Sequence, residues 1–61
     1  MPEVTIKMLE GRTLEQKRAL AKKVTEAIVE TTGATAEAVM INIEELKKEH
    51  LAKAGVLYYD K

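Results

Sequence analysis

Two residues of this 61-residue chain could take part directly in chemistry, Pro2 and Arg12. Pro2 follows Met1, and a small residue at this position normally leads to enzymatic removal of the methionine. Removal would leave the ring nitrogen of Pro2 as a free α-amine, whose reference pKa is about 7.7–8.0. A dry pocket or a nearby positive charge lowers the pKa of an amine, and a base that titrates near neutral pH transfers protons readily. Pro2 could therefore serve as a general base, on condition that Met1 is removed, because otherwise its nitrogen is an amide. By itself the proline is a weak signal, and the commoner alternative is that it means only that the methionine is cut off.

Arg12 follows Gly11 at the expected turn between a strand and a helix. A guanidinium group at such an edge can hold a carboxylate through two parallel hydrogen bonds. The alternative is an ordinary solvent-exposed arginine. The sequence offers little other chemistry, because it contains no serine for a triad and no glycine-rich phosphate loop. The single histidine, His50, lies among charged residues and has no cysteine or second histidine with which to share a metal ion.

The composition predicts one small domain, residues 1–61, that associates with copies of itself. A core in a chain of this size rarely supplies more than about 3–5 kcal/mol, and the absence of cysteine rules out disulfide support. Hydrophobic residues make up 46% of the chain, although only Tyr58 and Tyr59 are aromatic. We therefore assign part of this apolar surface to a subunit interface. Ten basic residues balance ten acidic residues, which gives no electrostatic footprint for nucleic acid. No signal peptide or membrane-length apolar run is evident, so we expect a soluble, cytoplasmic protein.

Hydrophobic periodicity predicts a strand, a helix and a second strand. Residues 3–9 and 39–45 alternate in polarity, as strands do. Thr13 and Gln16 fit a capping box for a helix over 13–32, and Gly33 is placed to end that helix. A tight helical turn is expected at 35–38.

This order of elements predicts an α/β (α+β) fold, with two parallel strands joined by a right-handed crossover helix. The expected apolar stripe of the helix consists of Leu20, Val24, Ala27, Ile28 and Thr31. It would cover the sheet face formed by Val4, Ile6, Met8, Val39, Ile41 and Ile43. The opposite face, with Thr5, Lys7, Leu9, Met40 and Asn42, has no element left to cover it. Because a two-stranded sheet is marginal alone, we expect a second subunit there.

The C-terminal segment gives conflicting signals. Residues 44–53 are rich in helix formers, and helix propensity alone would place a helix there. Gly55 interrupts this stretch, and residues 56–59 form a short apolar run with strand propensity. We favour a loop followed by a short hairpin or an added strand.

The chain resembles the 4-oxalocrotonate tautomerase family. The resemblance rests on Pro2, on the following strand, and on the turn Leu9-Glu10-Gly11-Arg12 that leads into Thr13-Leu14-Glu15-Gln16-Lys17. It continues through the helix and the second strand to Lys48, His50 and Gly55. It implies a β-α-β fold and a homo-oligomer, most often a hexamer built as a trimer of dimers, without cofactor or metal.

The resemblance also implies a function. An isomerase of this family uses its amino-terminal proline, here Pro2, as general base and then acid between the enol and keto forms of an unsaturated 2-oxo acid. The usual substrate is 2-hydroxymuconate, in the degradation of aromatic compounds. Arg12 matches an arginine that binds a substrate carboxylate from a neighbouring subunit. Leu9, Met40 and Leu51 are the expected pocket-lining residues.

Two of these positions depart from the family pattern. Met40 stands where a second arginine is usual, and Leu51 where a phenylalanine is usual, while Ala52 and Ala54 replace nearby glycines. Losing one preorganised donor typically lowers the rate by about 10²–10³-fold. A dicarboxylate is therefore expected to be a poor substrate, and a smaller acid or an aromatic enol such as phenylenolpyruvate a better one. Candidate replacement donors are Lys7, Asn42 and Lys53.

Alternative interpretations remain open at the level of the sequence. Met40 and Leu51 could mark a decayed pocket in a non-catalytic relative, or could be ordinary core or interface residues. The same scaffold could instead carry out hydration or dehalogenation of unsaturated acids, with a protonated proline as the acid. A self-associating module without activity is a further alternative, although it leaves Pro2 and the glycine-arginine turn unexplained.

Overall fold

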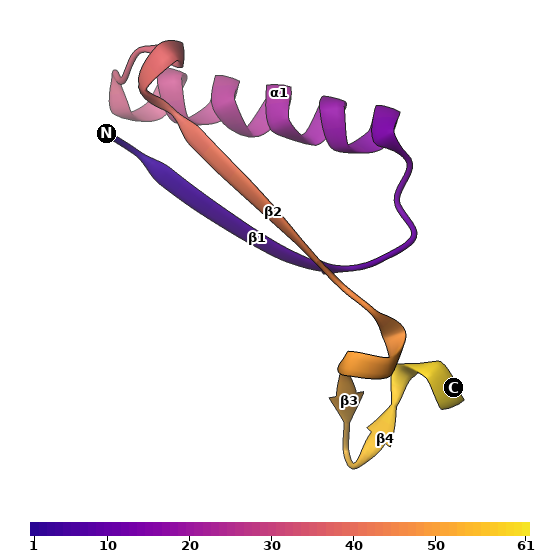
Figure 1. The fold of residues 1–61 in the computed structure, drawn as a ribbon. Helices are drawn as coiled ribbons and strands as arrows, with labels where there is room; N and C mark the ends of the chain where they lie inside the picture. The colour runs from indigo at the N-terminus through magenta and orange to yellow at the C-terminus, as the bar shows by residue number, and fades with distance from the viewer.

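The computed structural model describes residues 1–61, which form a β-α-β body followed by a short C-terminal arm (Figure 1). We call residues 1–46 the body and residues 47–61 the arm. The body consists of β1 (Glu3–Leu9), α1 (Leu14–Thr32), the 3₁₀ helix η1 (Ala36–Ala38) and β2 (Met40–Leu46). The arm consists of η2 (Lys48–His50), β3 (Ala52–Lys53), β4 (Val56–Leu57) and η3 (Tyr58–Asp60).

The strands β1 and β2 pair in parallel, as predicted, from Glu3 opposite Met40 to Leu9 opposite Leu46. β2 starts one residue later than the predicted 39–45. The reason is that the N–H of Val39 donates to the carbonyl of Ala36 (3.2 Å) and so closes η1. The N–H of Met40 is the first in the ladder.

Helix α1 is capped at both ends by the residues that the sequence indicated. Thr13 Oγ1 accepts from the N–H of Gln16 (3.1 Å), and Gln16 Oε1 accepts from the N–H of Thr13 (2.9 Å), which completes the capping box. At the other end, Gly33 adopts a left-handed conformation (φ 77°), and its N–H donates to the carbonyl of Val29 (3.1 Å). The helix bounds therefore agree with the prediction, with Thr13 as the cap.

The face that α1 turns toward the sheet differs from the predicted stripe. Ala27 and Thr31, which were expected to face inward, are exposed. The half-buried positions of α1 are Lys17, Leu20, Ala21, Val24, Thr25, Ile28 and Val29. These follow steps of three and four from the first turn, whereas Ala27 and Thr31 lie on the flank of that row.

The sheet has one covered face and one open face. All six residues predicted to lie under the helix, from Val4 to Ile43, are half-buried, whereas Thr5, Lys7, Met40 and Asn42 are exposed. No residue of the chain is fully buried, and the molecule measures 43 × 23 × 14 Å along its principal axes. The single chain therefore has no closed core. Its one long helix, α1, lacks the apolar length that crossing a membrane requires.

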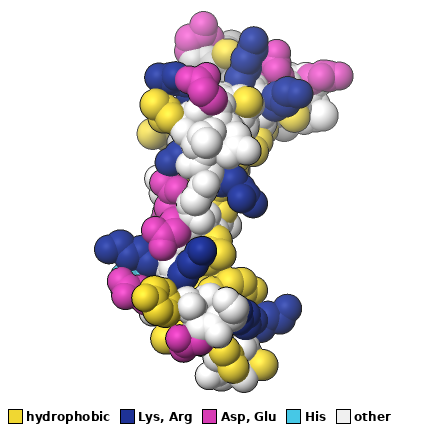
Figure 2. Space-filling model, turned by 90° about the vertical axis from the view of Figure 1, so that its right-hand side faces the viewer, with side chains coloured by type: hydrophobic (Ala, Val, Ile, Leu, Met, Phe, Trp, Pro, Cys, Tyr) yellow, Lys and Arg dark blue, Asp and Glu magenta, His cyan; other side chains and the backbone are white.

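The arm contains the short hairpin expected near the C-terminus. Lys53 pairs with Val56 around the two-residue turn Ala54-Gly55, in which both residues have positive φ (54° and 80°). The apolar run ends as a strand at Leu57, because η3 begins at Tyr58. The N–H of Tyr58 still donates to the carbonyl of Leu51 (2.8 Å) and so closes the hairpin. The arm projects from the body, and Figure 2 shows hydrophobic side chains among charged ones on its surface. Its exposed apolar residues are Val56, Leu57 and Tyr59.

Candidate functional site

Pro2 is fixed at the start of β1 by a backbone hydrogen bond. Its carbonyl accepts from the N–H of Met40 (3.0 Å), which extends the ladder by one step beyond Glu3. Pro2 is half-buried, while Met1 before it is 83% exposed. The backbone of Pro2 is therefore tied to the first residue of β2, while Met1 is largely exposed to solvent.

A shallow hollow of about 400 Å³ lies along the first residues of β1 and β2, and Pro2 itself is not part of its lining. Its lining residues are Glu3, Val4, Thr5, Met40, Ile41 and Asn42. The side chain of Met40 is 55% exposed and brings a flexible thioether without charge to this place. The only charged residue in the lining is Glu3. The lining of this hollow therefore supplies no cation.

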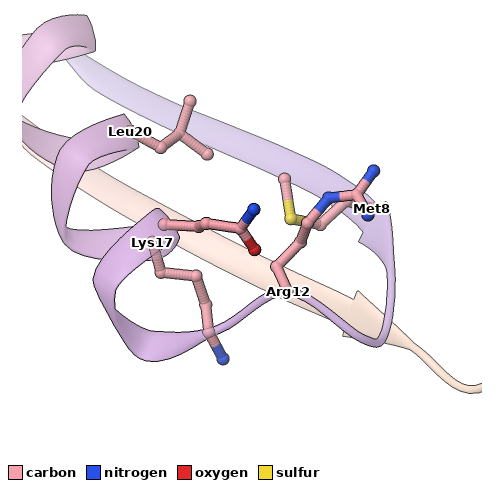
Figure 3. A pocket seen from close by; sticks show the side chains of 5 residues that line it. Met8, Arg12, Lys17 and Leu20 are labelled. Atoms are coloured by element: carbon pink, nitrogen blue, oxygen red, sulfur yellow. The ribbon is translucent and has the colours of Figure 1, made fainter.

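Arg12 lies at the opposite end of β1, in the loop between β1 and α1. Its side chain is exposed and forms no ion pair. It borders a second hollow, of about 230 Å³, together with Met8, Gln16, Lys17 and Leu20. Figure 3 shows the guanidinium group of Arg12 beside Met8, and Leu20 on the helix at the other side of the hollow. This hollow thus combines a cation with the apolar surface between the sheet and the helix.

Within one chain, Pro2 and Arg12 are too far apart to bind the same small acid. The seven residues of β1 separate them, and at about 3.3 Å per residue this strand spans roughly 23 Å. The ribbon in Figure 1 likewise places the N-terminus and the loop after β1 at opposite ends of the sheet. Any site that uses both residues must combine two chains.

The three residues expected to line a pocket are also dispersed. Met40 lies beside Pro2, Leu9 lies at the far end of β1 opposite Leu46, and Leu51 lies in the arm. Leu9 and Leu51 are half-buried, whereas Met40 is exposed. One chain therefore does not bring the predicted pocket together.

The candidate replacement donors are placed differently from one another. Asn42 lines the hollow along the first residues of β1 and β2, but its Nδ2 donates to Glu44 Oε1 (3.3 Å). Lys7 lies opposite Glu44 in the middle of the sheet, and Lys53 lies in the arm. Of the three, only Asn42 borders this hollow. No group of three histidine, aspartate or glutamate side chains gathers closely enough to hold a metal ion.

Sequence reasoning missed the surroundings of Arg12. Gln16 was identified as a capping residue, and Gln16 and Lys17 otherwise entered only as part of the stretch that resembles the family. In the structure both border the hollow of Arg12, and Lys17 Nζ forms an ion pair with Glu45 Oε1 (2.7 Å). The available signal was the spacing of four between Gln16 and Leu20, which places both on one side of α1 directly after the loop that carries Arg12.

The model of the tautomerase enzyme family matches residues 2–61 of the chain. The chain belongs to the tautomerase family. A relative from Bacillus subtilis (strain 168), named 2-hydroxymuconate tautomerase, is 64% identical over 55 residues, which are 90% of this chain and 89% of that protein. The family membership supports a role as a tautomerase, and hence as an isomerase.

Solved structures of tautomerase family members share the fold. YwhB, described as a homologue of 4-oxalocrotonate tautomerase, superposes with a TM-score of 0.92 at 58% identity and covers 98% of both chains. A heterohexameric 4-oxalocrotonate tautomerase from Chloroflexus aurantiacus J-10-fl gives a TM-score of 0.90 at 30% identity, over 98% of this chain and 97% of its own. These neighbours confirm the β-α-β arrangement with its parallel strand pair and short C-terminal hairpin, and the second shows that the family includes hexamers.

Proposed function

We propose that this protein is a keto–enol tautomerase of small unsaturated 2-oxo acids, and that the free ring nitrogen of Pro2 is its general base and acid. The observation that carries the proposal is the family match, which begins at Pro2 and leaves Met1 outside. The position of Pro2 adds support, because the residue is half-buried and its backbone is tied to the start of β2. Removal of Met1 is a condition of the proposal.

The proposed reaction moves one proton within the substrate, so the substrate and the product are isomers. The nitrogen of Pro2 takes the proton of the enol hydroxyl, and the electrons of that O–H bond form the carbonyl group. The electrons of the carbon–carbon double bond then take a proton from the protonated nitrogen at a carbon atom of the substrate. Pro2 returns to its uncharged state, so the cycle needs no cofactor or other reactant.

We further propose that Arg12 of a neighbouring subunit binds the substrate carboxylate. Within one chain, Arg12 and Pro2 lie at opposite ends of β1, and Arg12 is exposed without an ion-pair partner. A guanidinium in this state is available for two parallel hydrogen bonds to a carboxylate. The protein would then be a homo-oligomer, and a hexamer by analogy with the heterohexameric relative.

The class of substrate that we propose follows from the uncharged side chain of Met40. The Met40 N–H is bonded to Pro2, and the Met40 side chain gives the neighbouring hollow an apolar wall without a cation. One arginine binds one carboxylate, and a second carboxylate near Met40 would lose hydration without gaining a partner. We therefore expect a monocarboxylate such as phenylenolpyruvate to react better than the dicarboxylate 2-hydroxymuconate.

The test is a continuous ultraviolet assay with both acids, on protein whose intact mass shows that Met1 is absent. Wild-type protein should convert phenylenolpyruvate with the higher kcat/KM. Met40→Arg should raise kcat/KM for 2-hydroxymuconate relative to phenylenolpyruvate by about tenfold or more, because it adds a charge-assisted donor. Met40→Leu, the matched control, should leave that ratio within about twofold, since it conserves volume and polarity. Absence of turnover with either acid would refute the proposed function.

A further inference from the structure

The junction between body and arm depends on a single side chain, that of Glu10. Glu10 Oε2 accepts from the N–H of Lys48 (3.1 Å) across 38 positions of sequence. No other hydrogen bond or ion pair joins residues 1–46 to residues 47–61. The arm otherwise bonds only within itself, through its hairpin and the bonds that form η2 and η3.

Glu10 holds the chain on both sides of Lys47. Its own N–H donates to the carbonyl of Leu46 (2.8 Å), and its carboxylate receives the N–H of Lys48. Lys47 supplies no side-chain cap to η2, so the carboxylate of Glu10 replaces the cap that a local residue would provide. Two bonds from one residue therefore fix the direction in which the chain leaves β2.

The same residue lies two positions before Arg12. Gly11 between them has φ 120°, a conformation that L side chains rarely adopt, so the loop turns sharply directly after Glu10. The tie to residues 46–48 therefore also fixes the start of the loop that carries Arg12. Glu10 therefore fixes both the loop with Arg12, the residue proposed to bind the substrate carboxylate, and the arm with Leu51.

We propose that Glu10 is a positioning residue that couples the Arg12 loop to the arm and so sets the affinity of the site for anionic substrates. This inference rests on the proposed function, because it assigns Arg12 to the substrate carboxylate. A bond to a charged acceptor is stronger than a neutral one, and small misplacements of a binding group cost affinity. Loss of the bridge should therefore raise KM and change kcat less.

Two variants separate positioning from a simple charge effect. Glu10→Gln keeps an acceptor oxygen at the same reach, whereas Glu10→Ala removes it. Each removes one negative charge near Arg12, which on electrostatic grounds alone would lower KM for an anion equally in both. The bridge predicts instead that Glu10→Ala raises KM by about fivefold to tenfold, the effect of one such hydrogen bond on a binding constant, and that Glu10→Gln stays within about twofold of wild type. Glu30→Ala, which removes an exposed acid from α1, should change nothing.

Amide hydrogen exchange of the segment around Lys48, on the same full-length proteins, provides a readout that does not need activity. Exchange should accelerate in Glu10→Ala and stay near the wild-type rate in Glu10→Gln. An unchanged KM in Glu10→Ala, or equal shifts of KM in both variants, would overturn the positioning role. If the wild-type protein turns over no enol acid, the proposed function fails separately. In that case, equal exchange in Glu10→Ala and wild type overturns the bridge, and faster exchange in Glu10→Ala alone supports it.

Discussion

The body, residues 1–46, and the arm, residues 47–61, differ in the interactions that stabilise each of them. The body has two paired seven-residue strands under a 19-residue helix that is capped at both ends. The arm consists of four elements of two or three residues each, turns on a non-glycine residue with positive φ, and joins the body through one hydrogen bond. Neither part buries a residue completely.

The residues proposed to carry out the chemistry therefore lie in the better supported part of the chain, and one expected pocket residue lies in the other part. Pro2 and Arg12 both lie in the body, where the ladder of β1 and the capped start of α1 hold the backbone. Leu51 lies in the arm, whose position relative to the body has little support within one chain. We therefore expect substitutions in the body to alter reaction or binding strongly, and substitutions in the arm to act weakly on the isolated fold.

The largest expected effect is that of Pro2→Ala. The backbone carbonyl at position 2 can still accept from the N–H of Met40, so circular dichroism should report an unchanged fold. The secondary amine is replaced by a primary amine that no ring holds in place, and kcat/KM should fall by about 10²-fold or more, toward the full contribution of a general base. A variant as active as wild type, measured by the ultraviolet assay, would remove Pro2 from the mechanism.

Arg12→Ala should have the next largest effect. Without the guanidinium, KM for an anionic substrate should rise by about tenfold or more, since the loss of a charge-assisted pair costs about 1.5–3 kcal/mol. Lys22→Ala removes one positive charge from an exposed position of α1 and is the matched control. Steady-state kinetics that show the same KM for both variants would exclude Arg12 from the site.

Gly33→Ala tests the capped helix of the body. The φ of 77° at this position costs a residue with a Cβ about 1–2 kcal/mol, although the added atom would meet nothing within 4 Å. Urea denaturation at one fixed protein concentration should show this loss of unfolding free energy. An unchanged midpoint would mean that the left-handed cap does not limit the stability of the body.

Ala54→Gly tests the arm and should have the smallest effect, of opposite sign. Glycine relieves the positive φ of 54° but adds freedom to the unfolded chain, so the net gain should be about 0.5 kcal/mol. Ala52→Gly, in the paired part of the hairpin, carries the entropic cost alone and should lower the unfolding free energy. If Ala54→Gly and Ala52→Gly shift the urea midpoint in the same direction, the positive φ of Ala54 does not strain the arm.

The sequence predicted the body well because its signals are local. Alternation placed both strands within one residue of their bounds, and Thr13, Gln16 and Gly33 identified the ends of α1. The inward face of α1 was partly wrong, because a stripe chosen by apolarity included Ala27 and Thr31 and omitted Lys17 and Thr25. The hairpin was predicted from Gly55. The 3₁₀ turn η1 was expected at 35–38, but η2 and η3 were not predicted.

The candidate site was predictable only in its parts. Pro2 and Arg12 are recognisable by residue type and neighbours, and Met40 by its departure from the family pattern. Their separation along β1 follows from strand geometry. The proposed pairing of one chain's proline with another chain's arginine came only from the family resemblance and stays a prediction. The role of Glu10 was also invisible in the sequence, because its partner Lys48 is 38 positions away.

The central claim is that an unblocked nitrogen at Pro2 carries out the proton transfer, and chemical synthesis of this short chain permits a direct test. Two syntheses would begin at Pro2 and differ only in an acetyl group on its nitrogen. The measurement is kcat/KM for phenylenolpyruvate with each refolded protein. The account predicts that acetylation lowers kcat/KM by about 10²-fold or more, as the loss of a general base requires. Equal values for the free and the acetylated proteins would contradict it.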